Sequence, residues 1–220
     1  MTPTSINEKA LFLNNYRDVI IDWANKNEEL LVDGRKRYSW GDDTPTKCTM
    51  KRAEIIERLY VSKERNSGGI DLKTVNDVLR WGGFPSFPLD DPKEVLELTR
   101  DSLRLLDSGD TYGATIKLLR IPYVGIATAT KILGLTDPER FCIYDSRVGT
   151  ALRTLQKDGR RLILCPPGRS RGGDSASDSQ WARNYERLIW TLEVIRDQLN
   201  SKGYSYIISD IEMGLFMMGK

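Results

Sequence analysis

Residues 121–147 decide the fold of this chain, and they read IPYVGIATATKILGLTDPERFCIYDSR. Pro122 and Gly125 mark a tight turn directly before a run of small and apolar residues, which is the pattern of a helix start. We therefore expect a short helix over 111–119, a hairpin of about four or five residues, and a second helix from Ile126. Asp145 lies twenty residues after Gly125, before a further helix expected to start near Ser146.

This turn leaves the second helix with an exposed N-terminus. The first N–H groups of a helix have no partner within it and carry a partial positive charge, so together they can hold a phosphate. The small side chains from Ala127 to Thr130 leave room for a nucleic-acid backbone, which such contacts bind without reading its sequence. The residues expected at this interface are Tyr123, Val124, Gly125, Ile126, Ala127, Thr128 and Arg147. For Arg147, pairing with a nearby carboxylate is an equal alternative.

Composition narrows the function. The chain has 220 residues, 40% of them hydrophobic, which is enough for one compact unit over 1–220. It carries 33 basic and 31 acidic residues, so a site for a polyanion must be local. The absence of histidine excludes Ser-His-Asp catalysis and histidine-bound zinc, and three cysteines cannot hold a four-cysteine iron–sulfur cluster. No phosphate-loop or dinucleotide-binding motif is present, so ATPase and dehydrogenase functions are excluded.

The chain shows no sign of export or of membrane insertion. Its start lacks a basic region followed by an apolar run, and no later segment approaches about eighteen consecutive apolar residues. We expect a cytoplasmic protein that makes no contact with a membrane, with Cys48, Cys142 and Cys165 as reduced thiols.

Helical periodicity dominates the chain and predicts an all-α fold. The expected helices cover 8–32 with Gly34 as a stop, 50–63, 71–81, 91–106, 111–119, a segment from 126, 146–156, 179–200 and a segment from 210. Ser209 and Glu212 have the spacing of a capping box for the last helix. Residues 158–178 are expected as a loop, with a brief strand at 161–165, and no hairpin dipeptide is assigned.

The run IPYVGIATA, followed by DPERFCIYDSRV, resembles the helix-hairpin-helix DNA glycosylase superfamily, and within it bacterial proteins similar to 8-oxoguanine DNA glycosylase. The resemblance covers about residues 111–155, with a weaker match in the closing IEMGLFMMG. It implies a fold of two helical lobes flanking a cleft, with the helix-hairpin-helix motif at 111–135. It also implies a monomer that acts on double-stranded DNA containing a modified base and needs no metal or other cofactor, apart from a monovalent cation allowed at the hairpin.

The resemblance assigns the catalytic position to Asp145. A carboxylate there would stabilise the positive charge that develops on the sugar as the glycosidic bond breaks, and would position or deprotonate a water. Asp145 is also placed to cap the helix that follows it, and the two roles are compatible.

Two positions depart from the family pattern. Tyr123 stands where the hairpin usually has a glycine, which limits how closely the backbone approaches phosphate. Ala127 stands where members that cut the strand carry a lysine, so we expect removal of the base without strand cleavage. Lys131, one helical turn beyond Ala127, is the alternative source of an amine.

The target base must be flipped out of the duplex into a pocket. The candidates for its lining or for a wedge are Trp40, Asp42, Trp81, Phe84, Phe87, Asp210, Phe216 and Met217, each with core packing or capping as the alternative. Arg169 and Arg171 are candidates for contact with the DNA backbone, or for a solvated loop.

Three functions remain open. The first is a monofunctional DNA glycosylase, acting on an oxidised base in repair or on a modified base of foreign or phage DNA in antiviral defence. The second is a non-catalytic helix-hairpin-helix DNA-binding module. The third is a helical domain that serves structure or protein interaction.

Overall fold

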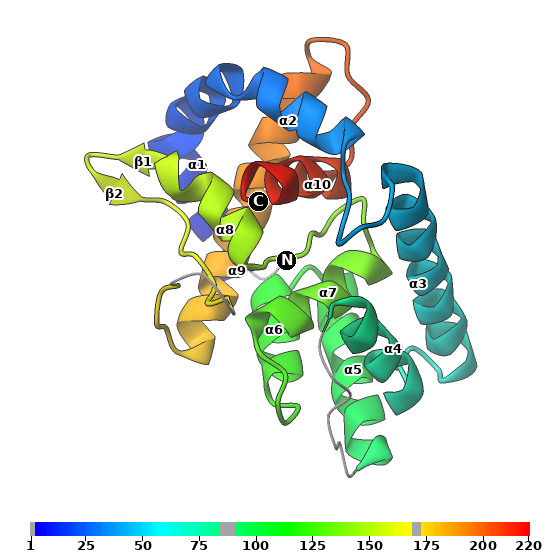
Figure 1. The fold of residues 1–220 in the computed structure, drawn as a ribbon. Helices are drawn as coiled ribbons and strands as arrows, with labels where there is room; N and C mark the ends of the chain where they lie inside the picture. Colours follow the sequence, from blue (N-terminus) through cyan, green and yellow to red (C-terminus); the bar gives the residue numbers. More distant parts are fainter. Residues whose placement is uncertain (1–2, 84–90, 169–172) are drawn as a thin grey trace.

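The computed structural model describes residues 3–83, 91–168 and 173–220. Within them the chain forms ten α-helices, one short 3-10 helix and one two-stranded sheet (Figure 1). The expected all-α class is confirmed. No helix in these ranges combines the length and the apolar composition needed to cross a membrane.

The chain begins with two helices, α1 (Pro3–Lys26) and α2 (Glu28–Lys36), which meet at Asn27. The expected single helix over 8–32 with a stop at Gly34 is therefore wrong. Gly34 lies inside α2, where a Cβ atom would stand 2.8 Å from the backbone oxygen of Gly214 in α10 (Ile208–Met218). A Cβ on Gly214 would in turn stand 2.7 Å from the backbone oxygen of Leu31. Glycine here permits close contact between two helices.

The next four helices begin at side-chain caps. In each case an oxygen of the preceding Thr or Asp side chain accepts a backbone N–H of the first turn, which satisfies a donor that the helix leaves unpaired. The helices and their caps are α3 (Pro45–Arg65, Thr44), α4 (Leu72–Trp81, Asp71), α5 (Pro92–Asp107, Asp91) and α6 (Thr111–Leu119, Asp110). The expected starts of α4, α5 and α6 are confirmed, and α3 begins earlier than expected because Thr44 and Pro45 form its start.

The hairpin leads into α7 (Ile126–Thr136), as expected, and Asp145 is the N-cap of α8 (Ser146–Ala151). A 3-10 turn (Leu152–Thr154) follows, so the expected helix over 146–156 ends early. Strands β1 (Gln156–Lys157) and β2 (Arg160–Arg161) then pair around Asp158 and Gly159, which have φ values of 51° and 73°. Asp-Gly is a favoured hairpin dipeptide because both residues can adopt positive φ, so the expectation that this loop contains no hairpin turn is wrong. The expected strand at 161–165 overlaps this hairpin only at Arg161.

The chain closes with α9 (Asp178–Asn200), which starts in a capping box of Ser177 and Gln180, and with α10. The predicted capping box of Ser209 and Glu212 is wrong. Asp210 accepts the N–H of Ile207 at 3.0 Å and takes the capping role. Ser209 and Glu212 instead accept hydrogen bonds from Arg52, which is buried on α3.

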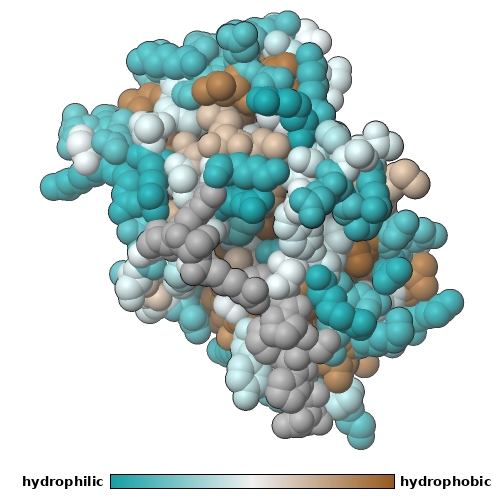
Figure 2. All heavy atoms as spheres, in the orientation of Figure 1, coloured by the Kyte–Doolittle hydropathy of each residue, from teal (hydrophilic) through white to brown (hydrophobic). Residues whose placement is uncertain are grey.

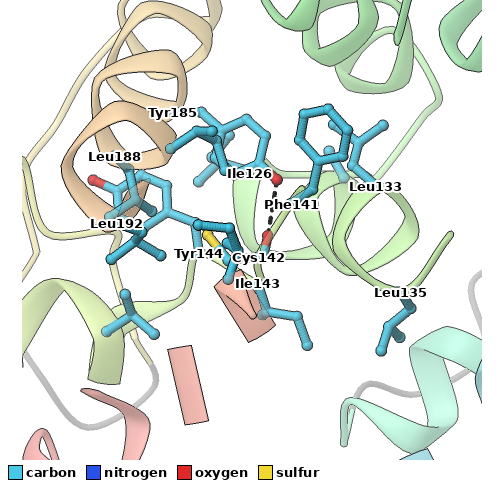
Figure 3. Packing of buried hydrophobic residues seen from close by; sticks show 14 of the residues in the cluster. Ile126, Leu133, Leu135, Phe141, Cys142, Ile143, Tyr144, Tyr185, Leu188 and Leu192 are labelled. Atoms are coloured by element: carbon cyan, nitrogen blue, oxygen red, sulfur yellow. Dashed lines mark hydrogen bonds between the residues drawn. The ribbon is translucent and has the colours of Figure 1, made fainter. Parts of the chain in front are cut away.

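The extended segment 141–144 carries the chain from α7 to Asp145 through the centre of the core (Figure 3). Its four side chains are buried, and the backbone oxygen of Cys142 accepts a hydrogen bond from the Tyr185 hydroxyl at 2.8 Å. The Tyr144 N–H donates to the Thr130 hydroxyl at 3.0 Å, and a Cβ on Gly134 would stand 2.5 Å from the Cys142 backbone. The segment is thereby held against both α7 and α9, and this fixes the position of Asp145.

The helices fall into two groups in space. Figure 1 shows α3 to α7 on one side of the molecule and α1, α2, α8 and α10 on the other. α10 packs on α2, α8 and α9, while α7 packs on α3, α4, α6 and α9. Lys131 of α7 and Glu212 of α10 line one pocket, which is described below.

A buried acid on α9 makes the stability of this core sensitive to pH. Glu186 is 3% exposed, and burial raises its pKa from 4.5 to about 7, although its ion pair with Arg183 acts in the opposite direction. An acid with a raised folded-state pKa binds more protons in the folded than in the unfolded chain between the two values. The free energy of unfolding therefore falls as the pH rises from about 4.5 to about 7.

We expect Glu186→Gln to be more stable than the wild type at about pH 8 and to lose this part of the pH dependence. Thermal unfolding at about pH 5 and pH 8 measures the effect. Glu97→Gln, at an exposed position on α5, is the control. A Glu186 variant with the same pH dependence as the wild type would contradict the assignment.

Candidate active site

A pocket of about 470 Å³ opens where the two groups of helices meet. It draws on the link between α2 and α3, the end of α4, the first turns of α7, the start of α8, the loop before α9, and α10. Its lining residues are Tyr38, Trp40, Trp81, Gly82, Gly83, Ala127, Lys131, Ile143, Asp145, Ser146, Arg147, Pro167, Gly168, Glu212 and Phe216. The structure thus brings together six residues that the sequence named as candidates for different roles: Asp145, Lys131, Arg147, Trp40, Trp81 and Phe216.

Asp145 combines the two roles that the sequence left open. One carboxylate oxygen, Oδ1, accepts the N–H groups of Arg147 and Val148 at 3.0 and 3.1 Å and so caps α8. The other oxygen, Oδ2, accepts no hydrogen bond from the described part of the chain. Capping holds the carboxylate in one orientation, and the second oxygen is left available to the pocket.

Lys131 lies in the same pocket and is only 5% exposed. Its side chain extends toward the N-terminus of α7, and its Nζ donates to the backbone oxygen of Ala127 at 3.2 Å. A Cβ on Gly82 would stand 2.7 Å from the Lys131 Cε, so the aliphatic part of the lysine packs directly on the end of α4. Burial lowers the pKa of Lys131, while the negative charges of Asp145 and Glu212 act in the opposite direction.

A buried ion pair adjoins the pocket, because its acid, Glu212, is a lining residue. The Arg52 Nη2 donates to the Glu212 Oε2 at 2.5 Å and to the Ser209 hydroxyl at 2.9 Å. Glu212 is 1% exposed, and burial raises its pKa. Neither Arg52 nor Glu212 was predicted from sequence as a site residue. Glu212 is the one charged residue in the otherwise apolar stretch 211–218 of α10, and this was the signal that could have found it, because an unpaired charge is not buried in a core.

Aromatic side chains form the walls. The rings of Trp40 and Trp81 lie edge to face, with centroids 5.6 Å apart. The Arg147 guanidinium lies over the Phe216 ring at 4.4 Å from its centroid. The Arg147 Nη1 is buried and has no hydrogen-bond partner among the described residues. The pocket therefore offers flat apolar surfaces and a buried donor, which suits a planar polar ligand.

The hairpin lies beside the pocket, and Ala127 in the first turn of α7 belongs to both. The N–H groups of Gly125, Ile126 and Ala127 donate no hydrogen bond within the described residues. Binding of an anion there stays a prediction. Val124, Ile126 and Thr128, by contrast, have buried side chains, so any contact there would use the backbone. Thr130 also faces the core. The expectation that this run of small residues faces DNA is therefore wrong, apart from Ala127.

Tyr123 keeps a glycine-like backbone, with φ 64° and a side chain that is 65% exposed. This left-handed conformation costs a residue with a Cβ about 1–2 kcal/mol, and glycine adopts it freely. We expect Tyr123→Gly to raise the free energy of unfolding by about 0.5–1 kcal/mol, because the relief exceeds the added flexibility of the unfolded chain. Tyr123→Ala also removes the ring but keeps the strain. Denaturant unfolding of both variants measures the difference, and an equal gain in the two would refute the explanation.

Several predicted residues lie elsewhere. Asp42 is exposed and outside the pocket lining, and its neighbour Asp43 pairs with Lys47 and Lys51 at 2.7 and 2.5 Å. Asp210 pairs with Arg35 at 2.5 Å and caps α10. Met217 accepts the N–H of Ser39 at 3.4 Å and does not line the pocket. The candidates Phe84, Phe87, Arg169 and Arg171 lie outside the described residues.

Cys48, Cys142 and Cys165 are buried free thiols. In the part of the chain that the structure describes, no group of three or more cysteine and acidic side chains is arranged to hold a metal ion. Comparison of the chain with protein-family models, curated proteins and solved structures finds no match.

Proposed function

We propose that this protein is a DNA glycosylase that takes a modified base from double-stranded DNA into the pocket and hydrolyses its glycosidic bond at Asp145. One observation carries the proposal. Asp145 is held rigidly by the cap of α8, keeps one oxygen unused by the fold, and shares its pocket with aromatic walls and a buried arginine donor. Ala127, one of the three residues with an available N–H group, also lines the pocket. One DNA strand could therefore place a phosphate at the hairpin and a flipped base in the pocket.

The chemistry follows from the carboxylate. As the bond between C1′ and the base nitrogen breaks, the base leaves with the electron pair and takes up a proton, and positive charge develops on the sugar. The Asp145 carboxylate stabilises that charge and accepts a proton from the water that adds to C1′. The product is an abasic site. Trp40, Trp81 and Phe216 offer faces for stacking the flipped base, and Arg147 and Glu212 offer a donor and an acceptor for its edge.

A panel of duplexes tests the proposal. Each carries one oxidised, alkylated or otherwise modified base, and modified phage genomes are included. After incubation with the protein, alkali cleaves the DNA at abasic sites, and chromatography detects the free base. We expect release from at least one substrate. Binding of DNA without release from any of them would favour the non-catalytic module, and absence of salt-dependent binding would favour a structural domain.

Strand cleavage through Lys131 is a second candidate, because Lys131 reaches back to Ala127 and is buried in the same pocket. Its neutral amine would attack C1′, displace the base and form an imine with the opened sugar. Loss of a proton from C2′ would then expel the 3′ phosphate, and water would release the amine.

Borohydride separates this candidate from hydrolysis, because it reduces the imine to a stable covalent complex. A complex that Lys131→Gln abolishes and Lys73→Gln retains would establish the lyase; Lys73 is an exposed lysine with 83% of its side chain accessible. Release of the base with no complex would leave hydrolysis alone.

A further inference from the structure

A second cavity, of about 880 Å³, lies between α1, α9 and the β1–β2 hairpin and shares no residue with the pocket at Asp145. We call it the cationic groove. One face of α1 contributes Glu8, Leu11, Phe12, Asn15 and Tyr16; α9 contributes Arg183, Arg187 and Trp190; the hairpin region contributes Lys157, Asp158, Arg160, Arg161 and Leu162. In Figure 2, hydrophilic side chains cover the hairpin at the left of the molecule.

Aromatic rings line the floor of the groove. Phe12 packs on Tyr16 and on Trp190, with centroids 5.0 and 5.6 Å apart. Leu11 stands at the mouth with 64% of its surface exposed. The rings are tilted by 48° and 55° to one another, and Phe12 and Trp190 are mostly buried, so Tyr16 is the ring with the most accessible surface on this apolar floor. The sides of the groove carry charge.

Five cations and two acids line the groove, so its net charge is positive. Arg161 and Arg183 are held by ion pairs, to Asp174 and to Glu8 and Glu186. Arg160 and Arg187 are exposed, and their guanidinium groups have no hydrogen bond or ion pair within the described residues. Together with Lys157, which pairs with no carboxylate among the described residues, these two arginines carry the positive charge of the groove that no acid offsets.

The hairpin that carries Arg160 is fixed rather than loose. Its turn is closed by Asp158 and Gly159, and the Lys157 Nζ donates to the backbone oxygen of Asn15 at 2.7 Å. The same ammonium lies over the Tyr16 ring at 5.4 Å from its centroid. Two contacts thus attach the hairpin to α1, and Arg160 stands on a preformed wall opposite α9.

We propose that the cationic groove binds a single-stranded segment of nucleic acid, with phosphates on Arg160 and Arg187 and bases toward the aromatic floor. Proteins that bind single-stranded nucleic acid combine a positively charged groove with aromatic side chains. The phosphates lie along the cationic residues, and the unpaired bases stack on the rings. A duplex hides its base faces and would use the charge alone. An acidic peptide would match the charge but not the floor. The proposal does not depend on base excision.

Fluorescence anisotropy of a labelled oligothymidylate of about 12 nucleotides tests it. We expect Arg160→Ser/Arg187→Ser to raise Kd at least about tenfold and to reduce the slope of log K against log salt by about 1.4, the value for two phosphate contacts on a single strand. Arg65→Ser/Arg104→Ser removes the same charge from exposed positions outside the groove and is the control. Tyr16→Leu should weaken binding at least about fivefold with an unchanged salt slope.

Three results would overturn the proposal: an equal loss in the control variant, full affinity in the groove variant, or displacement of the oligonucleotide by polyglutamate at matched charge. Circular dichroism and thermal unfolding verify that each variant is folded. If the wild type binds the strand through Arg160 and Arg187 but releases no base from any substrate, base excision is contradicted while the groove assignment stands.

Discussion

Asp145→Asn is expected to lower the rate of base release by at least about 10²–10³-fold while the fold and DNA affinity are retained. Asparagine caps a helix as well as aspartate does, so Oδ1 can still accept the N–H groups of Arg147 and Val148. What is lost is the negative charge beneath the sugar and the proton acceptor for water. Single-turnover release of the base measures the effect, with anisotropy for DNA affinity and circular dichroism for the fold.

The matched control for this variant is Asp42→Asn, at an exposed aspartate outside the pocket lining. It should release the base at the wild-type rate. Undiminished release by Asp145→Asn would place the chemistry elsewhere, and loss of structure in that variant would mean that the fold itself needs the negative charge. Because Asp145 raises the pKa of Lys131, the variant should also lower that pKa further.

Breaking the buried pair of Arg52 and Glu212 is expected to cost about 3–5 kcal/mol of the free energy of unfolding, because it leaves one charge without its partner in the interior. The two single variants should differ. Glu212→Leu leaves the buried guanidinium of Arg52 without its partner, and a guanidinium cannot lose its proton. Arg52→Met leaves the carboxyl of Glu212 without its partner. Burial raises the pKa of this carboxyl, so it can take up a proton and become neutral. We therefore expect Glu212→Leu to be the more destabilised of the two.

The pH dependence separates these cases. For Arg52→Met, stability should fall as the pH rises above the unfolded pKa of Glu212, because the folded state then holds a proton that the unfolded state releases. The double variant Arg52→Met/Glu212→Leu should recover most of the loss. Denaturant unfolding at about pH 5 and pH 8 completes the cycle, with the exposed pair of Arg196 and Asp197 as the control. Additive single effects would show that the pair is not coupled.

Local signals made much of this fold readable from sequence. Asp71 and Asp91 cap their helices as predicted, and Pro122 and Gly125 form the turn before α7. The capping of α8 by Asp145 was also predictable, because it depends on one continuous segment. Each of these features is decided within a few residues of the chain.

The failures arise where distant segments decide the outcome. Gly34 comes after a helical pattern, where a glycine usually ends a helix. Its contact with Gly214 shows that it instead allows two helices to pack closely. Glu212 has the spacing of a capping box, yet its partner Arg52 lies 160 residues away. Thr130 is small like its neighbours, but its hydroxyl holds the backbone of Tyr144. Sequence spacing carries no information on such pairs.

The contact between Gly34 and Gly214 also bears on how this site can change. It fixes α10 against α2 through backbone atoms, on a face that neither Glu212 nor Phe216 needs for its own orientation toward the pocket. We therefore expect Phe216, on the pocket side of α10, to be exchangeable without displacing the helix, whereas Glu212 is held by its ion pair with Arg52. If the pocket holds a base as proposed, single substitutions at Phe216 should change which base it accepts while α10 stays in place.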